Sequence, residues 1–221
     1  MTSDGLVERL AREVPLATLQ QFRPPRSAIV LPLMRALLGT LAGRTVVELG
    51  SGEPLLLAKA LVGEGAQVTA VDPALADPRV EPGGVRTLAV DLFELPQQAL
   101  APAELTLSTL LFGAPLRQRA RRHLWPRYLR RDRPTEDEVH AQLREVELAL
   151  LARLAAWTQP GGWTVHWSLE RLFAASAEDW RASGFSPLVL GRPESAPRSD
   201  DPQAWARFVL GGMVVAQRAG D

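Results

Sequence analysis

Strand-like and helix-like apolar segments alternate along most of this 221-residue chain. Short apolar runs at residues 45–49, 67–71, 85–90 and 104–108 have the length of buried strands, whereas residues 136–157 carry apolar side chains at steps of three and four. This alternation is typical of a mostly parallel sheet with helices on both faces. We therefore expect one α/β domain, because a chain of this length can bury a large core.

The remaining segments complete that domain without an interdomain linker. We expect further helices at 5–20, 27–42, 54–63, 94–101 and 177–183, and further strands at 163–169, 185–190 and 206–217. The long helix begins at a capping box, Thr135 with Glu138, and we expect Pro160-Gly161-Gly162 to stop it. The predicted organisation is a single domain over 1–221, with a helical cap at 1–42, a core at 43–221 and a substrate-side insertion at 112–134.

Composition excludes several classes of function. The 25 basic and 25 acidic residues leave no net charge, so bulk electrostatics does not favour nucleic acid or an anionic membrane. Without cysteine the chain has no disulfide, thiolate nucleophile or cysteine metal ligand, and its three histidines are too scattered for a metal motif. The N-terminal segment lacks a signal-peptide pattern. We expect a cytoplasmic protein, and the arginine- and alanine-rich composition is typical of a GC-rich bacterial genome.

The most informative segment is the end of the first predicted strand, Glu48-Leu49-Gly50-Ser51-Gly52. Glycines at this place let the backbone turn tightly and approach a ligand closely. Asp72 ends the next strand about 20 residues later, where a carboxylate can accept hydrogen bonds from both hydroxyls of a ribose. The segment therefore predicts a site for a ligand that contains adenosine.

The charge beside these glycines distinguishes two kinds of adenosine ligand. The dinucleotide motif G-x-G-x-x-G needs a third glycine where this chain has Leu55, and the charge of Glu48 would oppose a diphosphate. S-adenosylmethionine has no phosphate and carries a sulfonium and an ammonium group, which an acidic residue favours. The sequence therefore favours S-adenosylmethionine over NAD.

From about residue 44 to 217 the sequence resembles the class I (Rossmann-like) S-adenosylmethionine-dependent methyltransferases. The resemblance rests on the glycine segment, on Asp72, on Asp91-Leu92 after the third strand, and on Pro160-Gly161-Gly162 and Ser183-Gly184-Phe185 before the last strands. It implies a three-layer Rossmann-like sandwich with extra N-terminal helices. Its seven-stranded, mostly parallel sheet would have the order 3-2-1-4-5-7-6, with the last strand antiparallel.

The resemblance also implies a role for each matching residue. The cofactor's methionine part would lie against Glu48, Gly50, Ser51 and Gly52; Asp72, followed by Pro73, would bind the ribose; Asp91 and Leu92 would reach the adenine; and Ser108 would border the methyl group. S-adenosylhomocysteine would be the product, and no metal is implied. Two departures from the family pattern are Pro54, at the place of a common third glycine, and Leu110-Leu111, at a place that is often polar.

An arginine-dense stretch between residues 112 and 134 has two interpretations. Its arginines either form a solvated helix face or belong to a lid that grips an acidic acceptor; they are Arg117, Arg119, Arg121, Arg122, Arg127, Arg130, Arg131 and Arg133. Three residues in or beside it, His123, Tyr128 and His140, are the candidate catalytic groups. A further hypothesis is that an arm with Phe22, Arg23 and Arg26 closes over the carboxylate of the cofactor.

The leading functional hypothesis is methyl transfer to the O, N or C atom of a small molecule, which would be acidic if the arginine-dense stretch is a lid. The alternatives are a catalytically inactive S-adenosylmethionine-binding regulatory or scaffold protein and, less favoured, an NAD-dependent oxidoreductase. Nucleic-acid methylation is disfavoured, because the N/D-P-P-Y/F motif and the cysteine of pyrimidine-C5 enzymes are absent and the net charge is zero; the local arginine run leaves RNA as a minor alternative. We expect no DNA or membrane partner, and either a monomer or a homodimer.

Overall fold

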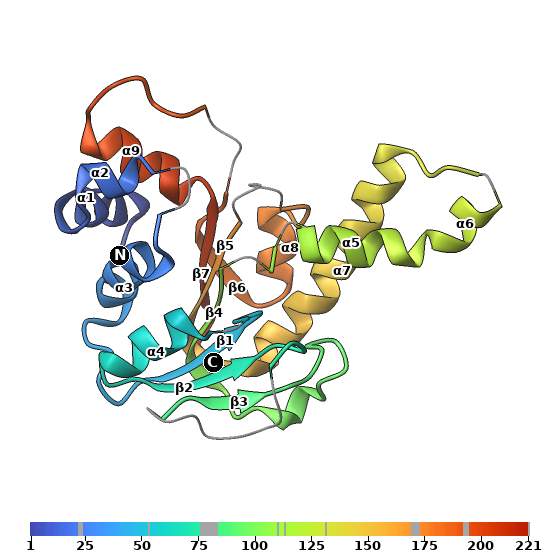
Figure 1. Cartoon of the computed structure of the whole chain (residues 1–221), viewed down its shortest axis with the longest axis horizontal. Helices are drawn as coiled ribbons and strands as arrows, with labels where there is room; N and C mark the ends of the chain where they lie inside the picture. Colours follow the sequence, from blue (N-terminus) through green and yellow to red (C-terminus); the bar gives the residue numbers. More distant parts are fainter. Residues whose placement is uncertain are drawn as a thin grey trace.

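The computed structural model describes residues 1–21, 24–52, 54–75, 84–109, 111–112, 114–130, 132–168, 173–191 and 195–220. Its centre is one seven-stranded sheet of order β3-β2-β1-β4-β5-β7-β6 (Figure 1). The strands are β1 (Thr45–Leu49), β2 (Gln67–Val71), β3 (Arg86–Leu88), β4 (Ala103–Ser108), β5 (Thr158–Trp167), β6 (Phe185–Val189) and β7 (Met213–Arg218). The helices are α1 (Ser3–Glu13), α2 (Leu16–Leu19), α3 (Arg26–Leu38), α4 (Leu56–Gly63), the 3-10 helix η1 (Gln97–Ala99), α5 (Ala114–His123), α6 (Trp125–Leu129), α7 (Glu136–Trp157), α8 (Ala177–Ala182) and α9 (Pro202–Leu210).

The expected sheet order and strand directions are confirmed. β1 pairs in parallel with β2 and β4, and β4 pairs in parallel with β5. β7 lies between β5 and β6 and is antiparallel to both. The carboxyl ends of β1, β2, β3 and β4 therefore meet at one edge of the sheet, which is where open α/β sheets bind ligands.

Two apolar clusters cover the two faces of the sheet, because neighbouring residues of a strand point to opposite sides. Val46 belongs to the cluster under α1, α3, α4 and α9, whereas Val47 belongs to the cluster under α7 and α8. Figure 1 shows these two groups of helices on opposite sides of the sheet. The result is the predicted three-layer sandwich.

The N-terminal helices are part of this sandwich. Leu6 and Leu10 of α1 and Ile29 and Leu33 of α3 are at most 1% exposed and belong to the first cluster. α1 also packs against α9 and α3. The structure thus places the bulk of residues 1–42 in a core layer, and only the start of α3 lies near the glycine turn.

The largest correction concerns the last predicted strand, residues 206–217. Most of the first half of that run is the end of helix α9, and strand β7 begins only at Met213. Asp201 caps the helix by accepting from the N–H of Gln203 at 2.9 Å, and Pro202 occupies its first position. Gly211 and Gly212 then separate helix from strand. The apolar residues of α9 face the first cluster, so a run that resembled one strand contains two elements.

A second correction concerns Pro160-Gly161-Gly162, which does not precede β5 but lies inside it. β5 begins at Thr158, directly after α7, and its register with β4 shifts between Ala103 and Leu105. A Cβ at Gly162 would come within 2.8 Å of the carbonyl oxygen of Gln159 and 3.0 Å of that of Glu104. Glycine is therefore required by this close approach. Smaller differences are that β3 covers three residues and that the helix expected at 94–101 is the 3-10 turn η1.

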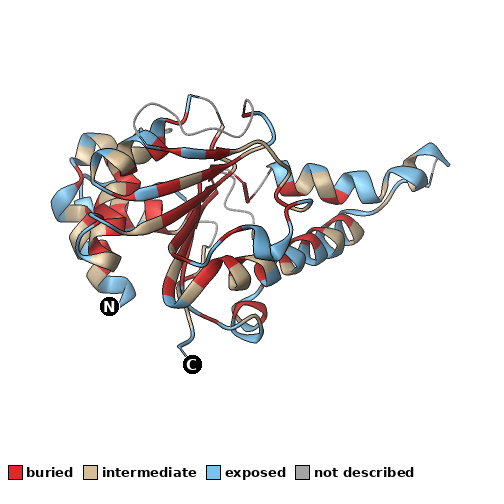
Figure 2. Cartoon of the chain, turned by 90° about the horizontal axis from the view of Figure 1, so that it is seen from below, coloured by how far each residue is buried: buried red, intermediate tan, exposed pale blue. Residues whose placement is uncertain are grey.

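Helices α5, α6 and the first half of α7 form an arm that extends beyond the sandwich. α5 and α7 lie side by side, and α6 is at the far end (Figures 1 and 2). Leu116 and Ala120 of α5 share the second apolar cluster with Leu143 of α7. No residue of α6 is buried, so the apolar contact between the helices ends before the tip of the arm.

The second cluster should carry much of the stability of the fold. Leu154→Ala removes a side chain that is 0% exposed and leaves a cavity beneath α7, so it should lower the free energy of unfolding by about 2–5 kcal/mol. Urea unfolding followed by circular dichroism measures this loss. The control Leu129→Ala, at a leucine that is 70% exposed, should change it by less than about 0.5 kcal/mol. Equal effects of the two substitutions would contradict the described packing.

Candidate functional site

The glycine turn after β1 adopts a conformation that suits glycine. Gly50 and Gly52 have positive φ angles of 67° and 62°, in the left-handed region. The N–H of Gly50 donates to the carbonyl of Val71 at 2.8 Å and so ties the turn to the end of β2. Leu55, just before α4, has φ 61° and is the one non-glycine residue of the described part with a positive φ. The strained backbone continues from the turn to the start of the helix.

Asp72 fixes the turn from the neighbouring strand. One carboxylate oxygen accepts from the N–H of Gly52 at 3.0 Å, and the other accepts from the N–H of Ala74 at 2.8 Å. The predicted partners, the glycine segment and the acid one strand away, are therefore in direct contact. An ionised carboxylate offers about four acceptor positions, so Asp72 keeps room for further donors.

Asp91 forms a third fixed point at the same edge. Its Oδ1 accepts from the N–H of Phe93 at 2.8 Å, and its Oδ2 pairs with Arg119 of α5 at 2.9 Å. The guanidinium of Arg119 lies 3.9 Å from the centre of the Phe93 ring, a cation–π contact. The arm is thus held against the end of β3 by an arginine that was predicted only as a member of the arginine run.

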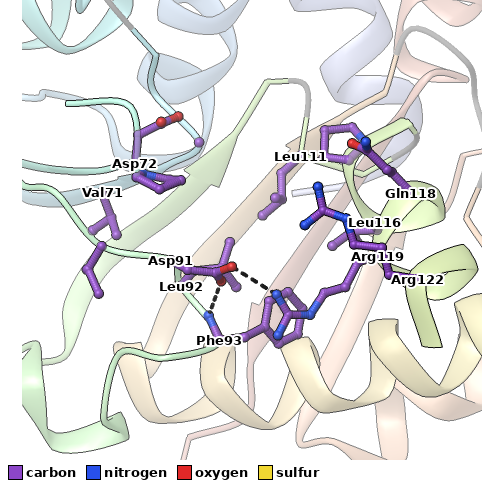
Figure 3. A pocket seen from close by; sticks show the side chains of 14 residues that line it. Val71, Asp72, Asp91, Leu92, Phe93, Leu111, Leu116, Gln118, Arg119 and Arg122 are labelled. Atoms are coloured by element: carbon purple, nitrogen blue, oxygen red, sulfur yellow. Dashed lines mark hydrogen bonds and ion pairs between the residues drawn. The ribbon is translucent and has the colours of Figure 1, made fainter. Parts of the chain in front are cut away.

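These residues surround a cavity of about 240 Å³, here called the sheet-edge cavity. Figure 3 shows Asp72 on one side, Arg119, Arg122 and Gln118 of α5 on the other, and Asp91 between them. Sequence reasoning missed Phe93 and Gln118. Arg119 and Arg122 are three positions apart, so they share one face of α5, a spacing that the sequence does display. The complete lining is Gly50, Val71, Asp72, Pro73, Val90, Asp91, Leu92, Phe93, Leu111, Pro115, Leu116, Gln118, Arg119 and Arg122.

A second cavity, the loop cavity of about 330 Å³, lies on the other side of the glycine turn. Ser51 and Pro54 line it from the turn, and Arg26 lines it from the start of α3. The hydroxyl of Ser51 is buried and has no hydrogen-bond partner among the described residues. Arg26 is thus placed as the sequence hypothesis requires, whereas Phe22 and Arg23 lie outside the described residues.

Glu48 lies beneath the turn and does not line either cavity. It is 1% exposed, and burial raises its pKa to about 7 against the opposing effects of Arg26 and the N–H of Ala58. Asp72 raises this pKa slightly further, which shows that the two acids are near one another. The N–H of Ala58 belongs to the first turn of α4, so Glu48 lies near the anion-binding end of that helix, and its Oε2 has no hydrogen-bond partner among the described residues.

Ser108 takes part in a buried chain of hydrogen bonds between β4 and β5. Its hydroxyl bonds Nδ1 of His166 at 2.8 Å, and Nε2 of His166 bonds Thr164 at 2.5 Å. Thr164 bonds Thr106 at 3.0 Å, and Thr106 bonds Thr158 at 2.8 Å. Ser108 is at the carboxyl edge as predicted, but its hydroxyl points into this chain and the residue lines neither cavity.

His166, which is hydrogen-bonded to Ser108, was not predicted from the sequence as a site residue. It is 0% exposed, its ring lies 4.6 Å from that of Phe112, and burial lowers its pKa to about 3. It is therefore uncharged at neutral pH. Polar residues at every second position of β4 (Thr106, Ser108) and of β5 (Thr164, His166) are the signal that these side chains share one buried face.

The three predicted catalytic residues lie on the arm. His123 ends α5, Tyr128 is in α6, and His140 is on the exposed side of α7. None of them lines the sheet-edge or the loop cavity. The structure does not bring them to the glycine turn, and their catalytic role stays a prediction.

Two other findings concern the described part of the chain. No helix there has the length and the apolar character needed to cross a membrane. No group of three or more histidine, aspartate and glutamate side chains there is arranged to hold a metal ion.

Several solved methyltransferases are similar to this chain at low sequence identity. The antibiotic-resistance methyltransferase Kmr has 14% identity, over 86% of this chain and 93% of its own, with a TM-score of 0.47. The 1,6-didemethyltoxoflavin-N1-methyltransferase of Burkholderia thailandensis, solved with S-adenosylhomocysteine, has 19% identity over 85% of this chain and 75% of its own, with a TM-score of 0.46. The 16S rRNA (adenine(1408)-N(1))-methyltransferase of Catenulisporales acidiphilia has 17% identity over 82% of this chain and 90% of its own, also with a TM-score of 0.46.

No family model and no curated protein sequence matches the chain. Likeness to solved structures at the level found here concerns the arrangement of helices and strands and says nothing of the substrate.

Burial of Glu48 should make the stability of the protein depend on pH. Its pKa in the folded state, about 7, is above its ordinary value, so folding takes up a proton between about pH 4.5 and 7. The contribution of Glu48 to stability is therefore full below this window and is lost as the pH rises through it. Glu48→Gln should remove this loss and gain about 1–3 kcal/mol over the wild type between pH 5 and 8.

Urea unfolding across that pH range measures the effect. Glu8→Gln, at an exposed glutamate of α1, serves as the control. Its free energy of unfolding should depend on pH in the same way as that of the wild type. If the free energy of unfolding of Glu48→Gln also depends on pH in the same way as that of the wild type, Glu48 is ionised in the folded protein over the whole pH range.

Proposed function

We propose that this chain is an S-adenosylmethionine-dependent methyltransferase. The observation that carries the proposal is the contact between the glycine turn and Asp72, with the buried acid Glu48 directly beneath. Two carboxyl groups at one turn favour a nucleoside with positive charge and disfavour one with phosphates. Sheet order 3-2-1-4-5-7-6, which the resemblance to class I methyltransferases implied, supports the same proposal.

The start of α4 argues against a dinucleotide. A diphosphate at a glycine turn is normally bound by free N–H groups in the first turn of the following helix. Here the N–H of Ala58 lowers the pKa of Glu48, so a carboxyl group of the protein lies near this end of α4 and, when ionised, would oppose a diphosphate. Leu55 replaces the third glycine of the dinucleotide motif, and its side chain is only 4% exposed, so it fills the space between helix and sheet. We infer that NAD is a poor ligand for this turn.

The residues of the two cavities suit the parts of S-adenosylmethionine. Asp72, with acceptor capacity left over, would bind the ribose hydroxyls, and Asp91 would accept from the adenine amino group, with Pro73 and Leu92 as apolar walls. Gly50 and Gly52 let the ligand pass close to the backbone. Ser51 and Arg26 of the loop cavity would bind the amino-acid end, the arginine pairing with its carboxylate. When bound, the cofactor supplies an activated methyl group.

Glu48 and Ser108 would support the cofactor site without contacting the ligand. Glu48, whose pKa is raised to about 7, would ionise beneath the turn when a cation binds above it, and Ser108 would be oriented by His166 at the end of β4. Both residues remain proposals as parts of the cofactor site.

For the acceptor, we propose an anionic molecule, which the sequence predicts to be small and methylated at O, N or C. Arg122 at the wall of the sheet-edge cavity supports an acidic group, because Arg119 beside it is already paired with Asp91. Alignment of the acceptor alone can supply roughly 7–11 kcal/mol of catalysis, so a conspicuous catalytic motif is not required. His123, Tyr128 and His140 would act as general bases only for an acceptor that extends along the arm.

The second candidate is a protein that binds S-adenosylmethionine without catalysis, in a regulatory or scaffold role. The observation that favours it is Leu111, which contributes an apolar wall where methyltransferases often keep a polar group. Incubation with methyl-labelled S-adenosylmethionine and a panel of acceptors separates the two candidates, because a binder saturates without forming a methylated product.

We further propose that residues 1–221 act as one domain, as a monomer or a homodimer, in the cytoplasm. The shared apolar clusters of the N-terminal helices and the sheet support the single domain.

Calorimetric titration with S-adenosylhomocysteine tests the cofactor assignment. The wild type should bind it, and Asp72→Asn should weaken binding by about 10- to 100-fold, because hydrogen bonds to a charged group contribute about 1.5–3 kcal/mol. NADH should give no saturable heat. Asp137→Asn, at an exposed aspartate of α7, is the matched control and should bind like the wild type. Tighter binding of NADH than of S-adenosylhomocysteine would refute the proposal.

A further inference from the structure

The tip of the arm exposes apolar and aromatic side chains that a soluble helix normally buries. Trp125 is 59% exposed and Leu129 is 70% exposed, and both are among the largest exposed apolar residues of the described chain. The ring of Tyr128 lies 6.1 Å from that of Trp125, so the two aromatic rings are neighbours on α6. Figure 2 shows this end of the molecule as exposed and distant from the sandwich. The fold itself does not need these residues.

Positive charge surrounds the aromatic pair. Arg117 and Arg127 are neutralised within the arm, the first by Glu136 and the second by Asp132 and Glu138. Further arginines, by contrast, have no ion pair within the part of the chain that the structure describes; they are Arg121, Arg122, Arg130 and Arg133. Arg131, which belongs to the same run, lies outside the described residues. Within the described residues, α5, α6 and the loop that follows them thus carry four arginines without an ion pair in a chain that has no net charge.

The charged surface is continuous with the sheet-edge cavity. Arg122 lines that cavity, and Arg121, next to it on α5, is exposed toward solvent. α5 then leads to α6, whose residues line neither cavity. A ligand seated on the tip of the arm would therefore run along α5 to the wall of the sheet-edge cavity, where the cofactor is proposed to bind.

We propose that the arm is an RNA-docking surface and that the acceptor atom belongs to an RNA, in place of the small molecule that the sequence predicts. Exposed arginines match phosphates, and an exposed tryptophan beside a tyrosine matches unpaired bases, which RNA loops offer for stacking. A free small molecule would use the cavity wall alone and would leave α6 without a role. Trp, Tyr and Arg are also enriched at protein interfaces, but several exposed arginines along α5 and α6 match the repeated phosphates of an RNA better than the scattered carboxylates of a protein surface. The acceptor class rests on the proposed methyltransferase function, but RNA docking does not.

Fluorescence anisotropy with a labelled RNA hairpin that has a single-stranded loop tests the proposal. Arg121→Ala/Arg130→Ala should raise the Kd at least tenfold and reduce the slope of log Kd against log salt by about 2, because each lost phosphate contact removes about one unit. Trp125→Ala should raise the Kd for RNA about tenfold through lost stacking. It should leave the Kd for a polyphosphate chain unchanged, because polyphosphate has no bases.

The matched control is Arg12→Ala/Arg207→Ala, which removes the same charge from exposed arginines of α1 and α9 and should change the Kd less than twofold. Every variant should bind S-adenosylhomocysteine like the wild type, which also shows that it is folded. RNA binding by the wild type that is equally weakened by the control, or unaffected by the arm variants, would overturn the proposal. So would a shift from dimer to monomer in sedimentation velocity on Trp125→Ala, because the tip would then be an interface between two copies.

The same experiments separate the two proposals. RNA binding that depends on the arm, together with a failure to bind S-adenosylhomocysteine, would refute the proposed function and leave RNA docking standing. Binding of S-adenosylhomocysteine without binding of RNA would refute RNA docking alone.

Discussion

The hydrogen bond from the Gly52 N–H to the carboxylate of Asp72 is the contact on which the candidate site depends. It joins the turn after β1 to the end of β2, and the bond from Gly50 to Val71 repeats the connection at the backbone. Because both strands lie in one parallel sheet, the turn is held at the carboxyl edge and divides it into two cavities. Without this contact the glycines would be free to move away from Asp72, and the two cavities would lose their common wall.

Charges of opposite sign lie on the two sides of this edge of the sheet. Glu48 is buried under the turn, and the N–H of Ala58 in the first turn of α4 lowers its pKa, so an acid of the protein itself lies near a helix end that usually binds anions. The far side of the sheet-edge cavity is positively charged, since Arg119 and Arg122 of α5 lie there opposite Asp72. Arg119 also pairs with Asp91, which couples the position of the arm to the adenine side of the proposed cofactor site. An acidic turn and a basic arm suit a cationic cofactor and an anionic acceptor.

The sequence was sufficient to predict elements whose pattern is local. β1, β2 and α7 were predicted with the observed bounds, since short apolar runs and a capping box define them. α9 was missed, because a helix that buries one face beside a strand looks like one apolar run. The contact of Asp72 with the turn follows from the parallel strand order. The hydrogen bond between Ser108 and His166, by contrast, joins β4 to β5 across 58 residues, and in the sequence only the polar residues at every second position of the two strands indicate it. Which arginines of the arm are neutralised depends on how α5, α6 and α7 pack, which no local pattern reveals.

A crystal structure of the protein with S-adenosylhomocysteine tests the central claim most directly. The account predicts electron density for adenosine in the sheet-edge cavity, with the ribose hydroxyls on Asp72 and the adenine amino group at Asp91, and the amino-acid end passing Gly50 and Gly52 toward Arg26. Density at any other place on the molecule, or adenosine that leaves the carboxylate of Asp72 without a ligand contact, would contradict it.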